Sequence, residues 1–164
     1  MTAELEELCQ ACGFCCDGTL FQKALLRPEE VPTAKRLGLH VIQDKGIAQP
    51  CPALTEAGCG VYAERPSVCQ SFICKLYARH RDEGGPLRPR LRKVERAKQL
   101  LAVMKQGGMK RSEDGSELTF EGEGMDGFAM MAAFSELMEL LEHDFARAVP
   151  AVRGGPDPAC TPAP

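Results

Sequence analysis

The chain has 164 residues, a formal net charge of −3 and 44% hydrophobic residues, with 5% aromatic residues and no tryptophan. This length is enough for one domain or a small module with a helical extension, and it excludes several large domains. The opening run MTAELEEL lacks the basic and apolar regions of a secretory signal, and no apolar run reaches the length of a membrane span. We therefore expect a cytoplasmic protein without a membrane segment, whose thiols stay reduced, whereas disulfides would be expected in a secreted chain.

The first cysteine group is the run C-x-x-C-x-x-C-C, which places four thiols within eight residues. The acidic segment before it predicts a short helix that carries Cys9 and Cys12, a pair whose spacing lets two sulfur atoms share one metal ion. Phe14 is expected to be an apolar cover over the site. Cys15 and Cys16 are adjacent, so their side chains point to opposite sides of an extended segment. This favours two metal ions or a multinuclear cluster.

The next elements lie between the two cysteine groups. Residues 17–21 predict a turn that leads into a short strand. Residues 27–39 predict a helix that ends at Gly38. Pro32 has no amide hydrogen to donate, so we expect the helix to kink or to restart there.

A second group consists of Cys51, Cys59, Cys69 and Cys74. Prolines on both sides of Cys51 keep its segment extended, and glycines on both sides of Cys59 let backbone amides approach its sulfur. Pro66 is suited to the first turn of a predicted helix that carries Cys69. Cys74 lies on another side of an ideal helix from Cys69, which predicts a different metal ion or an interrupted helix.

The second half of the chain is electrically segregated. Residues 75–111 hold twelve Lys and Arg against three acidic residues, and residues 112–150 hold ten acidic residues against one Arg. Apolar residues recur at helical spacing in both segments, and Gly107 and Gly108 end the first helix. We predict an antiparallel helical hairpin whose basic and acidic helices neutralise each other. The predicted apolar faces are Leu91, Val94, Ala97, Leu101 and Met104, then Phe128, Met131, Phe134, Met138, Leu141 and Phe145.

These patterns predict a mainly α fold with irregular, metal-stapled loops, in which a small cysteine-rich module packs with a C-terminal helical hairpin. We expect a metal-binding module over residues 1–80, the hairpin extension over residues 81–149, and a disordered tail over residues 150–164. An Asp114–Gly115 turn in the hairpin connection is expected to form a small β-hairpin or to stay a loop. Cys160 in the tail is expected to be a free thiol outside the metal site.

The cysteine runs resemble a known family. The runs CQACGFCC, CPAL, GCGVY, RPSVC and FIC are similar to the zinc- or iron-chelating cysteine-cluster proteins of the YkgJ type. The resemblance covers about residues 9–76, and an ordered set of eight cysteines is far more specific than one C-x-x-C pair. It implies a metal-chelating domain, and related domains occur in flagellin lysine methylases. The matching positions are Cys9, Cys12, Cys15, Cys16, Cys51, Cys59, Cys69 and Cys74, with Tyr62, Arg65 and Pro66 in the tyrosine and Arg-Pro places of the family.

The identity of the metal follows from ligand number and spacing. Eight cysteines fill two tetrahedral zinc sites, which favours two zinc ions. The C-x-x-C-x-x-C spacing also begins the cysteine run of bacterial ferredoxins, so iron or an iron-sulfur cluster is the alternative. Arg65 is expected either to offset the negative charge of bound thiolates or to lie on the surface.

For function, the sequence favours a metal-binding module whose site is mainly structural and which interacts with a protein partner. The alternative is an iron-sulfur redox protein or a component of a protein-modifying, methylase-like enzyme. The net charge and the few aromatic residues weigh against nucleic acid as a partner. No nucleotide-binding or hydrolase motif is present, and no catalytic residue is assigned. His80 and His143 are expected on charged helix surfaces.

Overall fold

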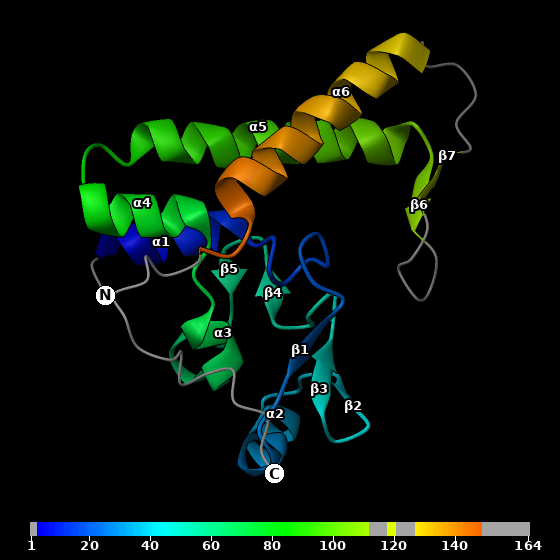
Figure 1. Cartoon of the computed structure of the whole chain (residues 1–164). Helices are drawn as coiled ribbons and strands as arrows, with labels where there is room; N and C mark the ends of the chain where they lie inside the picture. The colour runs from blue at the N-terminus through cyan, green and yellow to red at the C-terminus, as the bar shows by residue number, and fades with distance from the viewer. Residues whose placement is uncertain (1–2, 112–117, 121–126, 149–164) are drawn as a thin grey trace, which may run out of the picture.

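The computed structural model describes residues 3–111, 118–120 and 127–148, and it is mainly helical with three small sheets among these residues (Figure 1). The helices are α1 (Ala3–Cys12), α2 (Val31–Arg36), α3 (Ser67–Ser71), α4 (Lys75–Glu83), α5 (Arg88–Gln106) and α6 (Gly127–Leu140). The strands are β1 (Lys23–Leu25), β2 (Val41–Ile42), β3 (Gly46–Ala48), β4 (Leu54–Thr55), β5 (Gly58–Cys59), β6 (Met109–Arg111) and β7 (Leu118–Phe120). The longer helices form one layer, and the short strands with α2 and α3 lie beneath it (Figure 1).

Proline and glycine set the boundaries of the short helices. Residues Pro28–Glu30 form a 3₁₀ turn, and α2 then begins at Val31 with Pro32 in its first turn, so the predicted restart is confirmed. Gly38 follows α2 with a φ of +73°, a left-handed conformation that ends the helix. The turn predicted at residues 17–21 is present, since the amide of Thr19 donates to Asp17 Oδ1 over 2.8 Å, but the strand begins only at Lys23.

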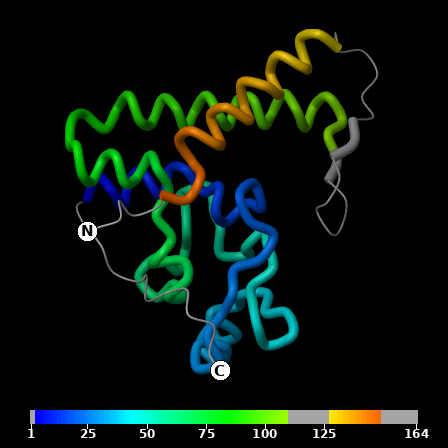
Figure 2. The backbone as a smooth tube through the Cα atoms, in the orientation of Figure 1, coloured from blue at the N-terminus to red at the C-terminus, as the bar shows by residue number. Residues whose placement is uncertain are grey.

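The predicted helix after Pro66 is interrupted. It ends at Ser71, because Phe72 is extended, and α4 begins at Lys75 with Cys74 as its N-cap. The N-terminal helix α1 lies beside α4 in the structure (Figure 2), although the whole strand region lies between them in the sequence. Strand β3 lies between β1 and β2, antiparallel to both, with Ile47 opposite Ala24 and Val41.

Helices α5 and α6 form the predicted hairpin, since α6 runs back across α5 (Figure 1). Charged pairs join them: Arg96 Nε lies 2.6 Å from Glu136 Oε1, and Lys93 Nζ lies 2.9 Å from Oδ1 of the buried Asp144 just beyond α6. Strands β6 and β7 pair antiparallel, as the predicted β-hairpin requires. The Asp114–Gly115 turn and the tail over residues 150–164, with Cys160, lie outside the described residues.

The predicted apolar face of α6 is confirmed at Phe134, Leu141 and Phe145, which pack in or against the larger cluster of buried side chains, and it is wrong at Phe128, Met131 and Met138. Phe128 is 82% exposed and Met131 is 69% exposed, whereas Leu137 is buried. The start of α6 is apolar on several sides, so helical periodicity alone does not select one face. A π-helical turn follows α6 at Leu141–Phe145 and contains one residue more than an α-helical turn. Residues on the same face as Phe145 by α-helical spacing therefore lie on a different face within α6.

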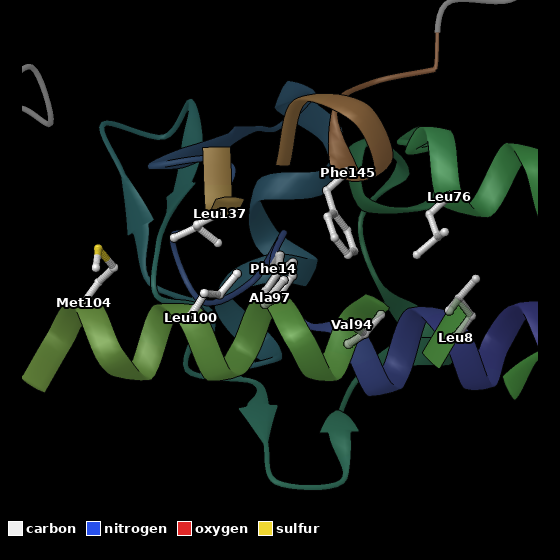
Figure 3. Close-up of a cluster of buried hydrophobic side chains, with 9 residues drawn as sticks. All are labelled: Leu8, Phe14, Leu76, Val94, Ala97, Leu100, Met104, Leu137 and Phe145. Atoms are coloured by element: carbon white, nitrogen blue, oxygen red, sulfur yellow. The ribbon is translucent and has the colours of Figure 1, made fainter. Parts of the chain in front are cut away.

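Two hydrophobic clusters hold the chain together. The larger joins the helices and is drawn in Figure 3: Leu8, Phe14, Leu76, Val94, Ala97, Leu100, Met104, Leu137 and Phe145. The smaller lies in the strand region: Leu26, Val31, Ala34, Leu39 and Ile47. Among the helices of the described residues, none has both the length and the apolar character that crossing a membrane requires.

Candidate metal centre

All eight cysteines of the two sequence groups line a single cavity of about 300 Å³. Its wall also includes apolar side chains, among them Leu20, Leu54 and Phe72. The eight residues are free thiols rather than disulfides; Cys9 is exposed and the other seven are partly buried. The fold therefore brings together two groups that are separated by 34 residues between Cys16 and Cys51.

The first group is positioned by the end of α1 and a tight turn. Cys9 and Cys12 lie three residues apart on α1, which places them on one face of the helix. Gly13 then adopts a φ of +72°, and its carbonyl accepts hydrogen bonds from the amides of Cys16 and Asp17 over 2.8 and 3.0 Å. This turn directs Cys15 and Cys16 toward the cavity, whose wall includes both residues.

The four cysteines of the second group lie on four different segments of the chain. The amide of Cys51 donates to the carbonyl of Cys16 over 2.7 Å, so the two groups meet through the backbone. Cys59 lies on β5, and its amide donates to Gln10 Oε1 over 2.6 Å. Cys69 lies on α3 and Cys74 precedes α4. No local spacing rule predicts these neighbours, because they depend on how the strand region folds against α1.

Burial is the main cause that raises the pKa values of the thiols. It raises the pKa to about 12 for Cys12 and Cys16, and to about 11 for Cys69. The pKa of Cys15 is raised as well, first by burial and then by the neighbouring thiolates. These thiols therefore keep their protons at neutral pH in the metal-free protein. A metal ion must displace those protons to bind.

Arg65 places a positive charge against the thiols. It is only 9% exposed, lines the cavity and stacks on Tyr62, with Cζ 3.6 Å from the centre of the ring. Its charge works against the burial that raises the pKa of the Cys69 thiol. The expected surface position of Arg65 is therefore wrong, and its expected proximity to the thiols is confirmed.

His80 is not on a charged surface, which corrects that expectation. It is 5% exposed, and its Nε2 lies 3.5 Å from Glu4 Oε2 of α1. Leu76 and His80 are four residues apart on α4, so both face α1. The polar sequence of α4 gave no apolar stripe that signals this packing. His143 is exposed, as expected.

The donor chemistry of the cavity fits a thiolate-bound metal, because Cys sulfur is the preferred ligand of structural zinc and of iron-sulfur clusters. Within the described residues, no three His, Cys, Asp or Glu side chains are already arranged so that they could hold an ion. Metal binding would remove the protons of the thiols that become ligands.

The family comparison agrees with this donor set. Residues 8–101, more than half of the chain, match the family model described as "CxxCxxCC: Putative zinc- or iron-chelating domain". The matched segment extends beyond the cysteines through α4 and most of α5. No curated protein and no solved structure matches the chain.

Proposed function

Because the chain belongs to the CxxCxxCC family of zinc- or iron-chelating domains, we propose that it binds metal through eight cysteine thiolates. The observation that carries this proposal is that all eight thiols line one cavity. The proposed ligands are Cys9, Cys12, Cys15, Cys16, Cys51, Cys59, Cys69 and Cys74.

Zinc is the metal that we propose first. Eight thiolates are the number that two tetrahedral zinc sites need, and closed four-thiolate sites are typical of structural zinc. In such sites the ion supplies folding free energy and no redox chemistry.

The proposed role of the metal is mainly structural. The strand region has a cluster of only five buried apolar residues, and its strands are two or three residues long. Such a region buries too little apolar surface to offset much conformational entropy, so metal ligation would supply much of its stability. We propose residues 1–80 as the metal-binding module and residues 81–149 as the extension packed on it.

We further propose a cytoplasmic protein that acts through a protein partner. The exposed apolar side chains of Phe128, Met131 and Met138 on α6 support a protein contact. Nucleic acid is not favoured, because Lys93 and Arg96 of the basic helix α5 are paired with acidic side chains. A reducing compartment would keep the eight thiols available for metal.

A second candidate is an iron-sulfur redox protein or a component of a methylase-like enzyme. The observation that favours it is the apolar wall of the cavity, with Leu20, Leu54 and Phe72 around the thiols. Limited solvent access is one of the factors that set the reduction potential of such clusters.

Metal analysis tests the proposal and separates the two candidates. The full chain, purified without a tag and without oxygen, is expected to hold about two zinc ions and to show no visible absorption band. Iron with acid-labile sulfide and a broad visible band would support the second candidate instead. A protein that holds no metal after purification and after anaerobic reconstitution would contradict both. Cys160→Ser is the matched control, because we expect it to keep the full metal content.

A further inference from the structure

We infer that the C-terminal segment, residues 145–148, is part of the metal centre: it forms one wall of the cysteine cavity and holds Cys74 in place there. The inference rests on the proposed function, because it assigns supporting residues to a metal that only the proposal places in the cavity. The segment lies beyond residues 8–101, which match the family model and contain all eight proposed ligands. The end of the helical hairpin thus completes a centre whose ligands all lie in the matched domain.

The backbone of the C-terminal segment pairs with the residues on both sides of Cys74. The amide of Lys75 donates to the carbonyl of Ala146 over 2.9 Å. In the opposite direction, the amide of Ala148 donates to the carbonyl of Ile73 over 2.8 Å. In Figure 1 the orange end of the chain lies beside the start of α4, which Cys74 precedes. The pairing therefore fixes the backbone of the residues that flank this cysteine.

The same pairing sets the direction of two side chains. Cys74 and Arg147 lie directly opposite each other in an antiparallel bridge. Side chains that are opposite each other in such a ladder point to the same side of it. Both residues line the cysteine cavity, and Phe145 lines it as well. The C-terminal segment thus contributes two residues to the wall, and Arg147 places a positive charge on the side of Cys74.

Ion pairs attach the start of the C-terminal segment to α4 and α5. Asp144, the residue before it, is only 2% exposed. Its carboxylate oxygens accept from Lys93 Nζ of α5 over 2.9 and 3.0 Å, and the carboxylate also pairs with Arg79 of α4. A buried carboxylate without a partner is strongly unfavourable, so these two cations keep Asp144 and the segment after it in this position.

Aromatic packing attaches the C-terminal segment to the first cysteine group. Phe145 is 1% exposed, and its ring lies edge to face against the ring of Phe14 (Figure 3). Phe14 belongs to the loop between Cys12 and Cys15. The segment therefore reaches both cysteine groups, because it packs against the loop of the first and pairs with Cys74 of the second.

The residues of the C-terminal segment are positioning residues rather than ligands. The sulfur of Cys74 accepts from the amide of Tyr77 in α4 over 3.4 Å. Helix α4 thus orients the thiol, and the C-terminal segment fixes the backbone that carries it. A ligand that is already fixed in the cavity loses less conformational freedom when an ion binds, so loss of the pairing should weaken metal binding.

Ala148→Pro tests the pairing in the full chain, because proline has no amide hydrogen to donate to Ile73. We expect the affinity for zinc, measured by competition with a chelator, to fall by about 10- to 100-fold, the range typical for residues that support metal ligands. Ala148→Ser keeps the amide and is the matched control, so its affinity should equal that of the unaltered chain. An unchanged affinity in Ala148→Pro would overturn the inference.

A double-mutant cycle with Cys74→Ser separates the positioning of this cysteine from a general loss of stability. A segment that acts through Cys74 has nothing left to position in the Cys74→Ser chain, so Ala148→Pro should cause no further loss of zinc affinity there. The same loss in both backgrounds would overturn the inference. Failure of the unaltered chain to bind zinc or iron would instead contradict the proposed function.

Hydrogen exchange on the unaltered full chain decides the question if Ala148→Pro does not fold. Zinc should slow the exchange of the amides of Lys75 and Ala148, which form the pairing, more than that of Gly107. The amide of Gly107 bonds to the carbonyl of Val103 at the far end of α5 and is the internal control. An equal or smaller effect of zinc at the two pairing amides would overturn the inference.

Discussion

The ring of Phe14 meets the ring of Phe145 edge to face, with centroids 4.9 Å apart and planes at 72°. Phe14 lies between Cys12 and Cys15, and Phe145 ends the π-helical turn after α6. Both rings are fully buried in the larger cluster (Figure 3). Phe14 is thus packed into the helical core and does not line the cysteine cavity, which Phe145 does line. The expected cover over the site is therefore not formed by Phe14.

Truncation of Phe145 should therefore destabilise the whole helical layer. Phe145→Ala is expected to lower the free energy of unfolding by about 3–5 kcal/mol, because it removes a buried ring and leaves a cavity beside Phe14. Denaturant unfolding followed by circular dichroism measures the change. Met131→Ala, on a side chain that is 69% exposed, is the control and should stay within about 0.5 kcal/mol. Equal effects of the two substitutions would contradict this account of the core.

Metal binding should release protons. The pKa values of Cys12 and Cys16 are raised to about 12 and that of Cys69 to about 11, so these thiols are neutral at pH 7 before an ion binds. Each thiol that becomes a ligand should release close to one proton, and metal affinity should fall as the pH falls. Calorimetric titration in buffers of different ionisation enthalpy measures the release. A binding heat that does not depend on the buffer would show that the thiols were already ionised.

The metal-free protein should lose stability at alkaline pH. Its buried thiols have raised pKa values in the folded state, so the folded chain keeps protons that the unfolded chain loses first. The contribution is fully present below an unfolded pKa of about 8.5 and is lost as the pH rises through the folded values. Unfolding at pH 8 and pH 10 should show the loss in the metal-free form. The metal-bound form is the comparison, and a similar loss there would assign the effect to other groups.

Removal of the charge of Arg65 should weaken metal binding. Its guanidinium lies against the thiols of the cavity and stacks on Tyr62. Arg65→Met is expected to lower metal affinity by about 10- to 100-fold, the range typical for residues that support metal ligands. Competition with a chelator measures the affinity. Arg36→Met removes an exposed arginine paired with Glu64 at 3.3 Å and should leave the affinity unchanged, and equal losses would indicate a nonspecific charge effect.

A side chain at Gly58 should disturb the β4–β5 hairpin. Its φ is +106°, and a Cβ atom there would collide with the side chain of Gln10. Gln10 Oε1 accepts a hydrogen bond from the amide of Cys59 on the same hairpin. Gly38→Ala is the matched control, because Gly38 has a φ of +73° but a Cβ atom there would meet no other atom within 4 Å. Both substitutions should lower the free energy of unfolding by about 1–2 kcal/mol, because alanine is strained in the left-handed backbone conformation. Thermal unfolding should show an additional loss only for Gly58→Ala, and equal losses would contradict the role of the Gln10 contact.

Local patterns in the sequence were sufficient for α1, for the restart of α2 and for the hairpin of α5 and α6, but they did not indicate the packing of α4 or the π-helical turn after α6. Proline fixes φ and removes an amide donor, whereas glycine permits the left-handed backbone that ends a helix, so the restart of α2 and its end before Gly38 could be predicted from single residues. The two cysteine groups and the family resemblance were also visible, because the spacing of eight cysteines is a property of the chain alone.

Only the tertiary structure decided which thiols are neighbours, which face of α6 packs, and that Arg65 and His80 are buried. Cys16 meets Cys51 because the strand region folds back on the loop after α1, and no sequence period encodes that contact. The apolar start of α6 offers several equivalent faces, so packing against α5 selects one. Local sequence determines backbone conformation, whereas burial and neighbours depend on contacts between distant segments, which only the folded chain brings together.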